Sequence, residues 1–278
     1  MIKRVAAMQD LSGLGHCSLS AAMAILPAQG IQCCPVPTCV LSTQTDGYTG
    51  YSFCDLTQAL DAYLEHWISL HERFDAVYTG YLGTQAQLSA AQRLICALKA
   101  PDGITLVDPV MGDDGALYTG VSPKMPDKMR SLITSADVIT PNLTEACLLA
   151  DRDYEDICPE QTIKLAGELA DFGPGRVVIS GIFSEEKVAM ACFDQGRACY
   201  IERPRAAQSY PGSGDVFAGV LLGRLLCGAP FFDAVEAAAD FVRICADACV
   251  KTAAVRREGL VFEPHLYRLI PRERECAG

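Results

Sequence analysis

The stretch SYPGSGDVFAG, residues 209–219, places an aspartate directly after a Gly-Ser-Gly turn and in front of the apolar run VLLGRLL. Two glycines allow a turn in which backbone N–H groups converge, and a helix that starts there adds the positive end of its dipole. Such a turn binds an oxyanion without a basic side chain. The stretch therefore indicates phosphoryl transfer, in which the amides of Gly212, Ser213 and Gly214 hold the phosphoryl charge and Asp215 accepts a proton. The simpler alternative is a helix start with Asp215 in its first turn.

Oxygen donors follow two other apolar runs. The segments DPVMGDD (108–114) and TPNLTE (140–145) contain Asp108, Asp113, Asn142 and Glu145. Magnesium prefers one or two carboxylates together with water and phosphate oxygens, so loosely gathered acidic groups near a phosphate site suit it. These segments predict a Mg-ATP site. The alternative is that Asp108 is buried and paired and that Glu145 only begins a helix.

Short apolar runs alternate with helical patterns along the chain, which predicts a mostly parallel sheet covered on both faces. Ligands bind such sheets outside the carboxyl ends of the strands, where the segments above lie. Without a linker or repeat, residues 1–278 are expected to form one domain, with the tail from about residue 256 packed outside the core. Strands are expected at 5–8, 34–41, 76–82, 104–111, 137–142 and 176–180, a hairpin at 188–204, and helices at 18–26, 55–67, 88–99, 124–133, 144–150, 160–173, after residue 215 and at 232–254.

Bulk properties narrow the class of protein. A net charge of -11 argues against a nucleic-acid groove or an anionic membrane surface. Fourteen cysteines without a CxxC pair indicate small buried thiols in a reducing compartment. With no signal peptide or membrane span in the sequence, we expect a cytoplasmic protein. A Walker-type phosphate loop is missing, and SGLGHCS matches a dinucleotide fingerprint only in part, which leaves the dinucleotide-binding fold as a minor alternative.

Several blocks, in order between about residues 4 and 255, resemble the vitamin B6 kinases of the ribokinase superfamily. They are AMQDLSGLGHCSLSAA, VLSTQTDGY, TGYLG, DPVMGD, TPNLTEACLL and GSGDVFAGVLL. The resemblance implies a ribokinase-like three-layer α/β/α sandwich, a homodimer, and transfer of the ATP γ-phosphate to the 5′-hydroxyl of pyridoxal, pyridoxine or pyridoxamine. It implies ATP and Mg²⁺ as cofactors, with K⁺ as a candidate monovalent cation.

The same resemblance assigns roles to residues of this chain. It makes Asp215 the general base and the Gly212–Gly214 turn the anion hole. The expected remaining site residues are Asp108, Asp113 and Glu145 at the metal, Asp108, Asn142, Glu145 and Ser180 at the nucleotide, and Asp10, Leu41, Thr45, Tyr81 and Tyr118 at the vitamer.

The chain departs from the family pattern at two positions. Asp10 stands where the family often has Ser, and Gln44 stands where it has His. A carboxylate at residue 10 is expected to favour pyridoxamine, whose aminomethyl group is cationic. Two alternatives remain. One is a hydroxymethylpyrimidine kinase, although those enzymes typically carry Cys where this chain has Asp215. The other is a protein that binds the vitamer or a nucleotide without turnover.

Overall fold

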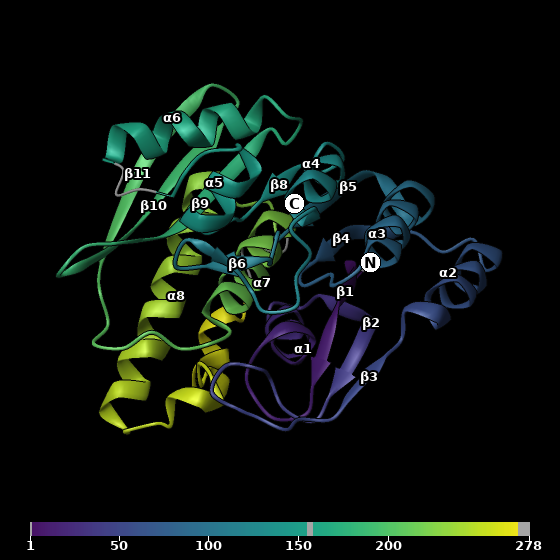
Figure 1. The fold of residues 1–278 in the computed structure, drawn as a ribbon, viewed down its shortest axis with the longest axis horizontal. Helices are drawn as coiled ribbons and strands as arrows, with labels where there is room; N and C mark the ends of the chain where they lie inside the picture. Colours follow the sequence, from purple (N-terminus) through teal and green to yellow (C-terminus); the bar gives the residue numbers. More distant parts are fainter. Residues whose placement is uncertain (1, 155–157, 272–278) are drawn as a thin grey trace.

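The computed structural model describes residues 2–154 and 158–271, and its main sheet has nine strands in the order β11-β10-β9-β8-β5-β4-β1-β2-β3 (Figure 1). The strands from β9 to β2 in this order are parallel, and the strands outside them at both edges are antiparallel. The predicted mostly parallel sheet is confirmed. The strands are β1 (Arg4–Ser12), β2 (Gln32–Leu41), β3 (Phe53–Asp55), β4 (Phe74–Thr79), β5 (Lys99–Val107), β8 (Val138–Ile139), β9 (Arg176–Phe183), β10 (Lys187–Asp194) and β11 (Arg197–Pro204).

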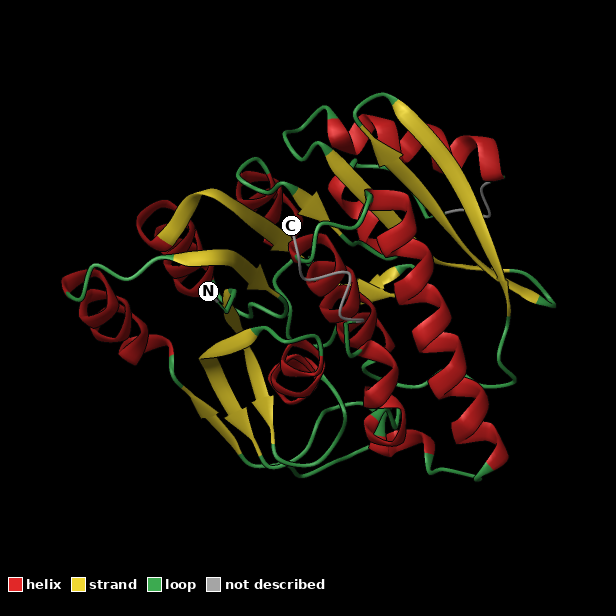
Figure 2. Cartoon of the chain, turned by 180° about the vertical axis from the view of Figure 1, so that it is seen from behind, coloured by secondary structure: helices red, strands yellow, loops and turns green. Residues whose placement is uncertain are grey.

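Helices cover both faces of this sheet, which Figure 2 shows from behind. One face packs against α1 (Ser18–Ala28), α7 (Ser213–Leu226) and α8 (Phe231–Lys251). The other packs against α2 (Leu60–Ser69), α3 (Gln85–Leu98), α4 (Met125–Ile133), α5 (Leu143–Leu149) and α6 (Pro159–Ala170). The predicted α/β/α sandwich is therefore confirmed.

Strand β1 shows why the apolar runs became central strands. Val5 and Ala7 lie in the core under α1 and α7, whereas Ala6 and Met8 lie in the core on the opposite face. A strand buried on both faces has no polar alternation, so it appears in the sequence as a continuous apolar run. In this position β1 pairs in parallel with β2 and β4, so the carboxyl ends of these three strands lie on the same side of the sheet.

Three short strands were not expected. The helix expected from residue 55 begins at Leu60, because Phe53–Asp55 form the edge strand β3. The strand expected at 104–111 ends at Val107, and a small hairpin follows it, made of β6 (Gly112–Asp113) and β7 (Ala116–Leu117). Strands of two or three residues are too short to show a period in the sequence.

The C-terminal tail was expected outside the core, and this is wrong for part of it. The 3₁₀ helices η2 (Arg256–Glu258) and η3 (Glu263–Leu269) flank an apolar run in which Leu260 and Phe262 are buried. The Leu260 amide donates to the Pro211 carbonyl (3.0 Å), so the run is bound to the chain just before α7. Residues 272–278 of that tail lie outside the described residues. No helix among the described residues is long and apolar enough to cross a membrane.

Candidate active site

The turn before α7 is built so closely that only glycine fits at its first position. Gly212 has φ +80° and caps the amino end of α7. A Cβ atom placed on it would lie 1.9 Å from the His16 carbonyl oxygen, which belongs to the loop after β1. The turn is therefore pressed against the β1 loop, and both belong to one site.

The amides of this turn differ in their partners. The Ser213 N–H donates to the Tyr210 carbonyl oxygen (3.3 Å), and the Ser213 hydroxyl donates to the same oxygen (2.7 Å). Within the described residues, no acceptor takes a hydrogen bond from the N–H of Gly214 or Asp215. Two donors at the positive end of a 14-residue helix are thus available to an anion, which is the arrangement expected of a phosphate site.

Asp215 lies in the first turn of α7 and is half-buried. Burial raises the pKa of Asp215 to about 7, a hydrogen bond from the Ser18 amide opposes this shift, and the charge of Asp10 adds to it. Ser18 is the first residue of α1 and has φ +50°, a strained value for a residue with a side chain. Ser18 was not expected at the site, because the sequence gives no sign that its amide faces an aspartate 197 positions later.

Asp108 lies directly after β5 and is only 6% exposed. Burial raises the pKa of Asp108 well above its usual value, and the charges of Glu145 and Asp215 raise it further, whereas the neighbouring Thr140 hydroxyl lowers it. One carboxylate oxygen of Asp108 is 4.0 Å from the position of a Cβ on Gly214. Three acidic side chains from three separate segments therefore influence one another at this edge of the sheet.

Glu145 has two roles at the start of α5. It forms a capping box with Asn142: the Glu145 amide donates to Asn142 Oδ1 (2.8 Å), and the Asn142 amide donates to Glu145 Oε2 (2.9 Å). The second carboxylate oxygen accepts the Met111 amide (3.0 Å), so Glu145 also holds the segment after β5. Burial raises the pKa of Glu145 to about 8, although these backbone hydrogen bonds lower it.

Asn142 and Ser180 connect the neighbouring segments. Asn142 Nδ2 donates to the Gly112 carbonyl oxygen (2.8 Å), and the Ser180 amide donates to the Pro141 carbonyl oxygen (2.9 Å). Asp113, by contrast, lies on the exposed hairpin β6–β7. Partial burial raises the pKa of Asp113, and the charge of Asp46, from the loop after β2, adds to the shift. The hairpin and that loop therefore approach each other across the site.

The acidic set can be tested against the needs of Mg²⁺. Asp108 and Glu145 are buried with raised pKa values, and within the described chain no Lys or Arg forms an ion pair with either. Among residues 2–154 and 158–271, no three His, Cys, Asp or Glu side chains are grouped as a complete set of metal ligands. Magnesium suits such a site, because it keeps several waters and takes only one or two carboxylates.

The expected vitamer residues lie around the ends of β1, β2 and β4. Asp10 is 7% exposed and accepts the Ser12 hydroxyl (3.2 Å), and burial raises its pKa. Leu41 is buried at the end of β2, whereas Thr45, in the loop after it, is exposed. Tyr81 is half-buried, and burial followed by the charges of Cys39 and Asp10 raises its pKa.

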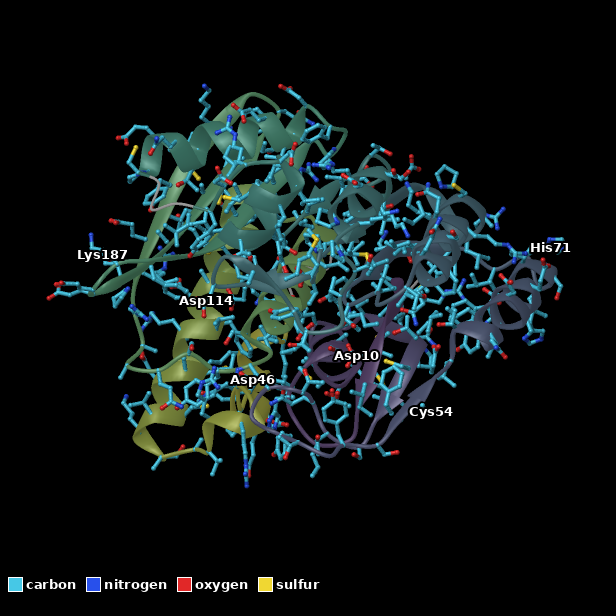
Figure 3. All side chains as sticks on the ribbon, viewed as in Figure 1. Asp10, Asp46, Cys54, His71, Asp114 and Lys187 are labelled. Carbon is cyan, nitrogen blue, oxygen red and sulfur yellow. The ribbon has the colours of Figure 1, made fainter. Side chains whose placement is uncertain are left out.

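Tyr118 and the acidic loops complete this side of the site. Tyr118 follows β7 and is 43% exposed; burial raises the pKa of its hydroxyl, followed by the charges of Glu145, Asp113, Asp108 and Asp215. Figure 3 labels Asp10 and Asp46 near the loops after β1 and β2, and Asp114 on the β6–β7 hairpin. The structure thus brings the predicted vitamer and phosphate residues to one edge of the sheet, where Thr45 is exposed in the loop after β2.

Gln44 has a structural position. Its side-chain amide donates to the Arg257 carbonyl oxygen (2.7 Å) and the Asp46 carbonyl oxygen (2.5 Å), and its Oε1 accepts the Asp46 amide (2.7 Å). Gln44 is therefore occupied in shaping its own loop and in binding that loop to the C-terminal tail.

Comparison with known proteins agrees with this geometry. The model of the phosphomethylpyrimidine kinase family matches residues 13–257. The chain belongs to this family. It is therefore a phosphotransferase with an alcohol group as acceptor.

The chain is similar to several proteins along nearly its whole length. A crystal structure from Bacteroides thetaiotaomicron, described as a phosphomethylpyrimidine kinase and solved with pyridoxal, is 36% identical, covers 98% of both chains and has a TM-score of 0.91. Pyridoxal kinase from Lactobacillus plantarum is 29% identical, covers 97% of both chains and has a TM-score of 0.89. Pyridoxal kinase PdxY of Aliivibrio fischeri is 27% identical over 84% of this chain and 85% of its own length. The resemblance to vitamin B6 kinases and the ribokinase-like fold are confirmed.

Proposed function

We propose that the protein transfers the γ-phosphate of ATP to the 5′-hydroxyl of a vitamin B6 vitamer, with Asp215 as the base. The observation that carries this proposal is the pairing of two available amides at the start of α7 with a half-buried carboxylate in the same helical turn. Relatives named as pyridoxal kinases support the acceptor. A pyridoxal kinase from Staphylococcus aureus, 25% identical with a TM-score of 0.77, was solved with the ATP analogue AMP-PCP, which supports the donor.

The proposed reaction needs the vitamer hydroxyl placed in line with the γ-phosphorus and the charge of the transferred group stabilised. The vitamer oxygen attacks the γ-phosphorus while the bond to the oxygen bridging the β- and γ-phosphates breaks, and ADP leaves. The hydroxyl proton passes to Asp215, whose pKa of about 7 makes it a stronger base than an ordinary aspartate. The Gly214 and Asp215 amides and the helix dipole stabilise the charge on the transferred group.

Asp108 and Glu145, with Asp113 on the hairpin above them, are the residues proposed to hold Mg²⁺. When bound, the ion neutralises phosphate charge, which also removes the mutual repulsion of these carboxylates. Asn142 and Ser180 are proposed to line the nucleotide side. Asp10, Leu41, Thr45, Tyr81 and Tyr118 are proposed to surround the vitamer. The homodimer, K⁺, the cytoplasmic location and the single domain over 1–278 remain predictions.

A pyrimidine is the second candidate acceptor, because the matching family carries the name of phosphomethylpyrimidine kinase. Both acceptors are flat heteroaromatic rings with a hydroxymethyl group, so the same transfer chemistry serves both. Binding without turnover is disfavoured by an intact base and anion site.

The decisive experiment is ADP release by the purified protein with Mg-ATP and, in separate reactions, pyridoxal, pyridoxine, pyridoxamine and hydroxymethylpyrimidine. Asp215→Asn should lower kcat about 10²- to 10⁴-fold, the usual contribution of a general base. Asp102→Asn, an exposed aspartate of β5, is the matched control and should retain activity. Turnover of the pyrimidine alone would move the protein to the second function, and equal activity of Asp215→Asn would remove the assigned base.

A further inference from the structure

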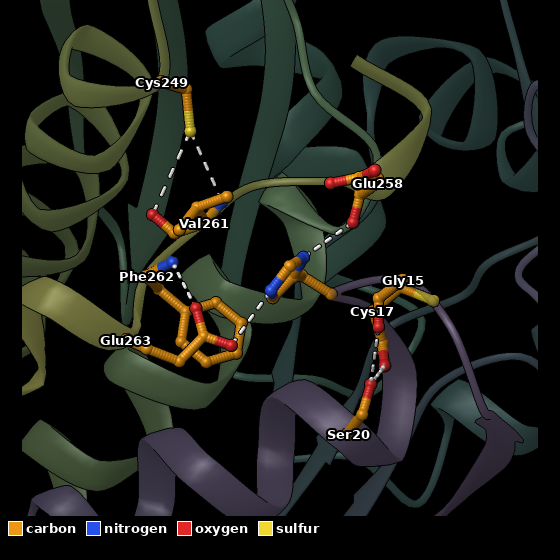
Figure 4. A network of polar contacts seen from close by, with 9 residues as sticks. Gly15, Cys17, Ser20, Cys249, Glu258, Val261, Phe262 and Glu263 are labelled. Atoms are coloured by element: carbon orange, nitrogen blue, oxygen red, sulfur yellow. Dashed lines mark hydrogen bonds and ion pairs between the residues drawn. The ribbon is translucent and has the colours of Figure 1, made fainter. Parts of the chain in front are cut away.

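The ring of His16 is fixed between two groups of the C-terminal segment, defined here as residues 256–263. His16 Nδ1 lies 2.6 Å from the Glu258 carbonyl oxygen, and Nε2 lies 2.9 Å from Glu263 Oε1. The ring also meets the Phe262 ring edge to face, at 5.5 Å between centroids. Figure 4 shows Glu258, Phe262 and Glu263 gathered around this contact. Each ring nitrogen thus lies within hydrogen-bond distance of an oxygen of the C-terminal segment.

The main chain of the same residue touches the proposed catalytic turn. The His16 carbonyl oxygen lies so close to Gly212 that a side chain there would collide with it. Two residues later, the Ser18 amide donates to the Asp215 carboxylate. A displacement of His16 would therefore move a hydrogen-bond donor of the base and the wall of the anion site together.

The C-terminal segment is anchored to the other loops of the site as well. Arg257 accepts the Gln44 side chain through its carbonyl oxygen (2.7 Å), and Leu260 donates to Pro211 (3.0 Å). Arg256 forms an ion pair with Asp46 (3.0 Å). The C-terminal segment thus connects the loop after β1, the loop after β2 and the chain before α7. On the loop after β1, the His16 side chain makes the contact with this segment.

We propose that His16 is a positioning residue for phosphoryl transfer: through its ring, the C-terminal segment holds the β1 loop in the register that aligns Ser18, Gly212 and Asp215. The proposal rests on the proposed function. A purely structural role for His16 would predict lower stability with an unchanged reaction per folded molecule, so the two can be separated.

The test compares His16→Ala with His66→Ala, a control on the exposed side of α2. We expect His16→Ala to lower kcat about 10- to 100-fold with a much smaller change in KM, because small misplacements of reacting groups cost about that much. The acid limb of kcat/KM should also move to higher pH, since Asp215 loses the Ser18 hydrogen bond that lowers its pKa. The other groups whose charges interact with Asp215 are Asp10, Cys17, Tyr78, Asp108 and Tyr118, and of these only Cys17 belongs to the displaced loop.

Glu263→Ala removes the same contact from the side of the C-terminal segment and leaves every residue of the β1 loop unchanged. It should produce a smaller effect in the same direction, and the double variant His16→Ala/Glu263→Ala should be no worse than His16→Ala, because the two residues act through one contact. Hydrogen exchange measured without substrate should be faster in peptides that cover 211–216 in His16→Ala.

An unchanged acid limb, an unchanged kcat per folded molecule and unchanged exchange at 211–216 would overturn the proposal. If Asp215→Asn is inactive in the same assays, the proposed function stands regardless. The exchange measurement tests the coupling even if the protein phosphorylates none of the compounds above.

Discussion

The two halves of the candidate site are held together in different ways. In the phosphate half, made of residues 108–113, 140–145 and 212–215, Glu145 binds the Asn142 amide three residues away and the Met111 amide 34 residues away. In the vitamer half, made of the loops after β1, β2 and β4, the contacts reach across the chain. Gln44 binds Arg257, 213 residues away, and His16 binds Glu258, 242 residues away.

The residues proposed for phosphoryl transfer and the residues proposed to bind the vitamer are thus held by different kinds of contact. The phosphate half carries several of its donors and acceptors in short motifs, but its turn before α7 also packs against the loop after β1, which supplies the Ser18 amide to Asp215. The vitamer half depends on the C-terminal segment for its shape. We therefore expect changes in the phosphate half to remove turnover, changes at His16 to lower kcat through the turn before α7, and changes at side chains expected to face the vitamer, such as Asp10, to alter selectivity.

After Asp215→Asn, the largest effect is expected from Gly212→Ala. Its Cβ would meet the His16 carbonyl oxygen at 1.9 Å, so the turn and the β1 loop must separate. We expect kcat/KM to fall about 10²- to 10³-fold, comparable with the loss of an oxyanion-hole donor. Gly196→Ala is the matched control: Gly196 has φ +85° and open space around it, so it carries the same backbone strain without a collision. Equal activity of the two variants would refute the close packing of the turn.

The next effect concerns pH. Because Asp215 must be ionised to accept a proton, kcat/KM should fall about tenfold per pH unit as the pH drops below about 7. The same burial destabilises the folded state. Because the Asp215 carboxyl keeps its proton to a higher pH in the folded than in the unfolded chain, the free energy of unfolding falls as the pH rises toward about 7. Asp215→Asn should therefore have a higher Tm than the unmodified protein above pH 7. An acid limb near pH 4, or a lower Tm, would contradict the assignment.

The smallest effect is expected from Asp10→Ser in the vitamer half. Removing the carboxylate should lower the ratio of kcat/KM for pyridoxamine over pyridoxal by about tenfold or less, because a single partly screened charge pair is worth about 1 kcal/mol. Asp10→Asn keeps the size and the acceptor for Ser12, and so separates charge from shape. An unchanged ratio in both variants would show that the Asp10 carboxylate does not favour the cationic vitamer.

Much of the phosphate half was predictable because its signals are local. Gly-Ser-Gly-Asp before an apolar helix predicts a glycine turn at the start of that helix with Asp215 in its first turn, and both are present in α7. Asn142 with Glu145 forms a recognisable capping box. The central strands were predictable from their unbroken apolar runs. The Ser213 amide was expected in the anion hole, but it donates to the Tyr210 carbonyl oxygen instead. The sequence does not determine which of the neighbouring amides in this turn is left without a partner in the described part of the protein.

The vitamer half was predictable mainly from family resemblance. No local pattern predicts Ser18 beside Asp215, or His16 between Glu258 and Glu263, since each contact joins distant segments. The tail was misplaced for the same reason: its charged residues suggested an outer position, yet Leu260 and Phe262 fill the core beneath α1 and α7.

The contact between His16 and Glu258 also bears on how the protein is made. During synthesis at about 5–20 residues per second, roughly 12–50 s pass between the emergence of these two residues, which are 242 positions apart. The sheet strands near the start of the chain can pair during that interval, but the loop that faces the base has no C-terminal segment to hold it. The loop after β1 therefore gains its C-terminal contact only when nearly the whole chain has been made.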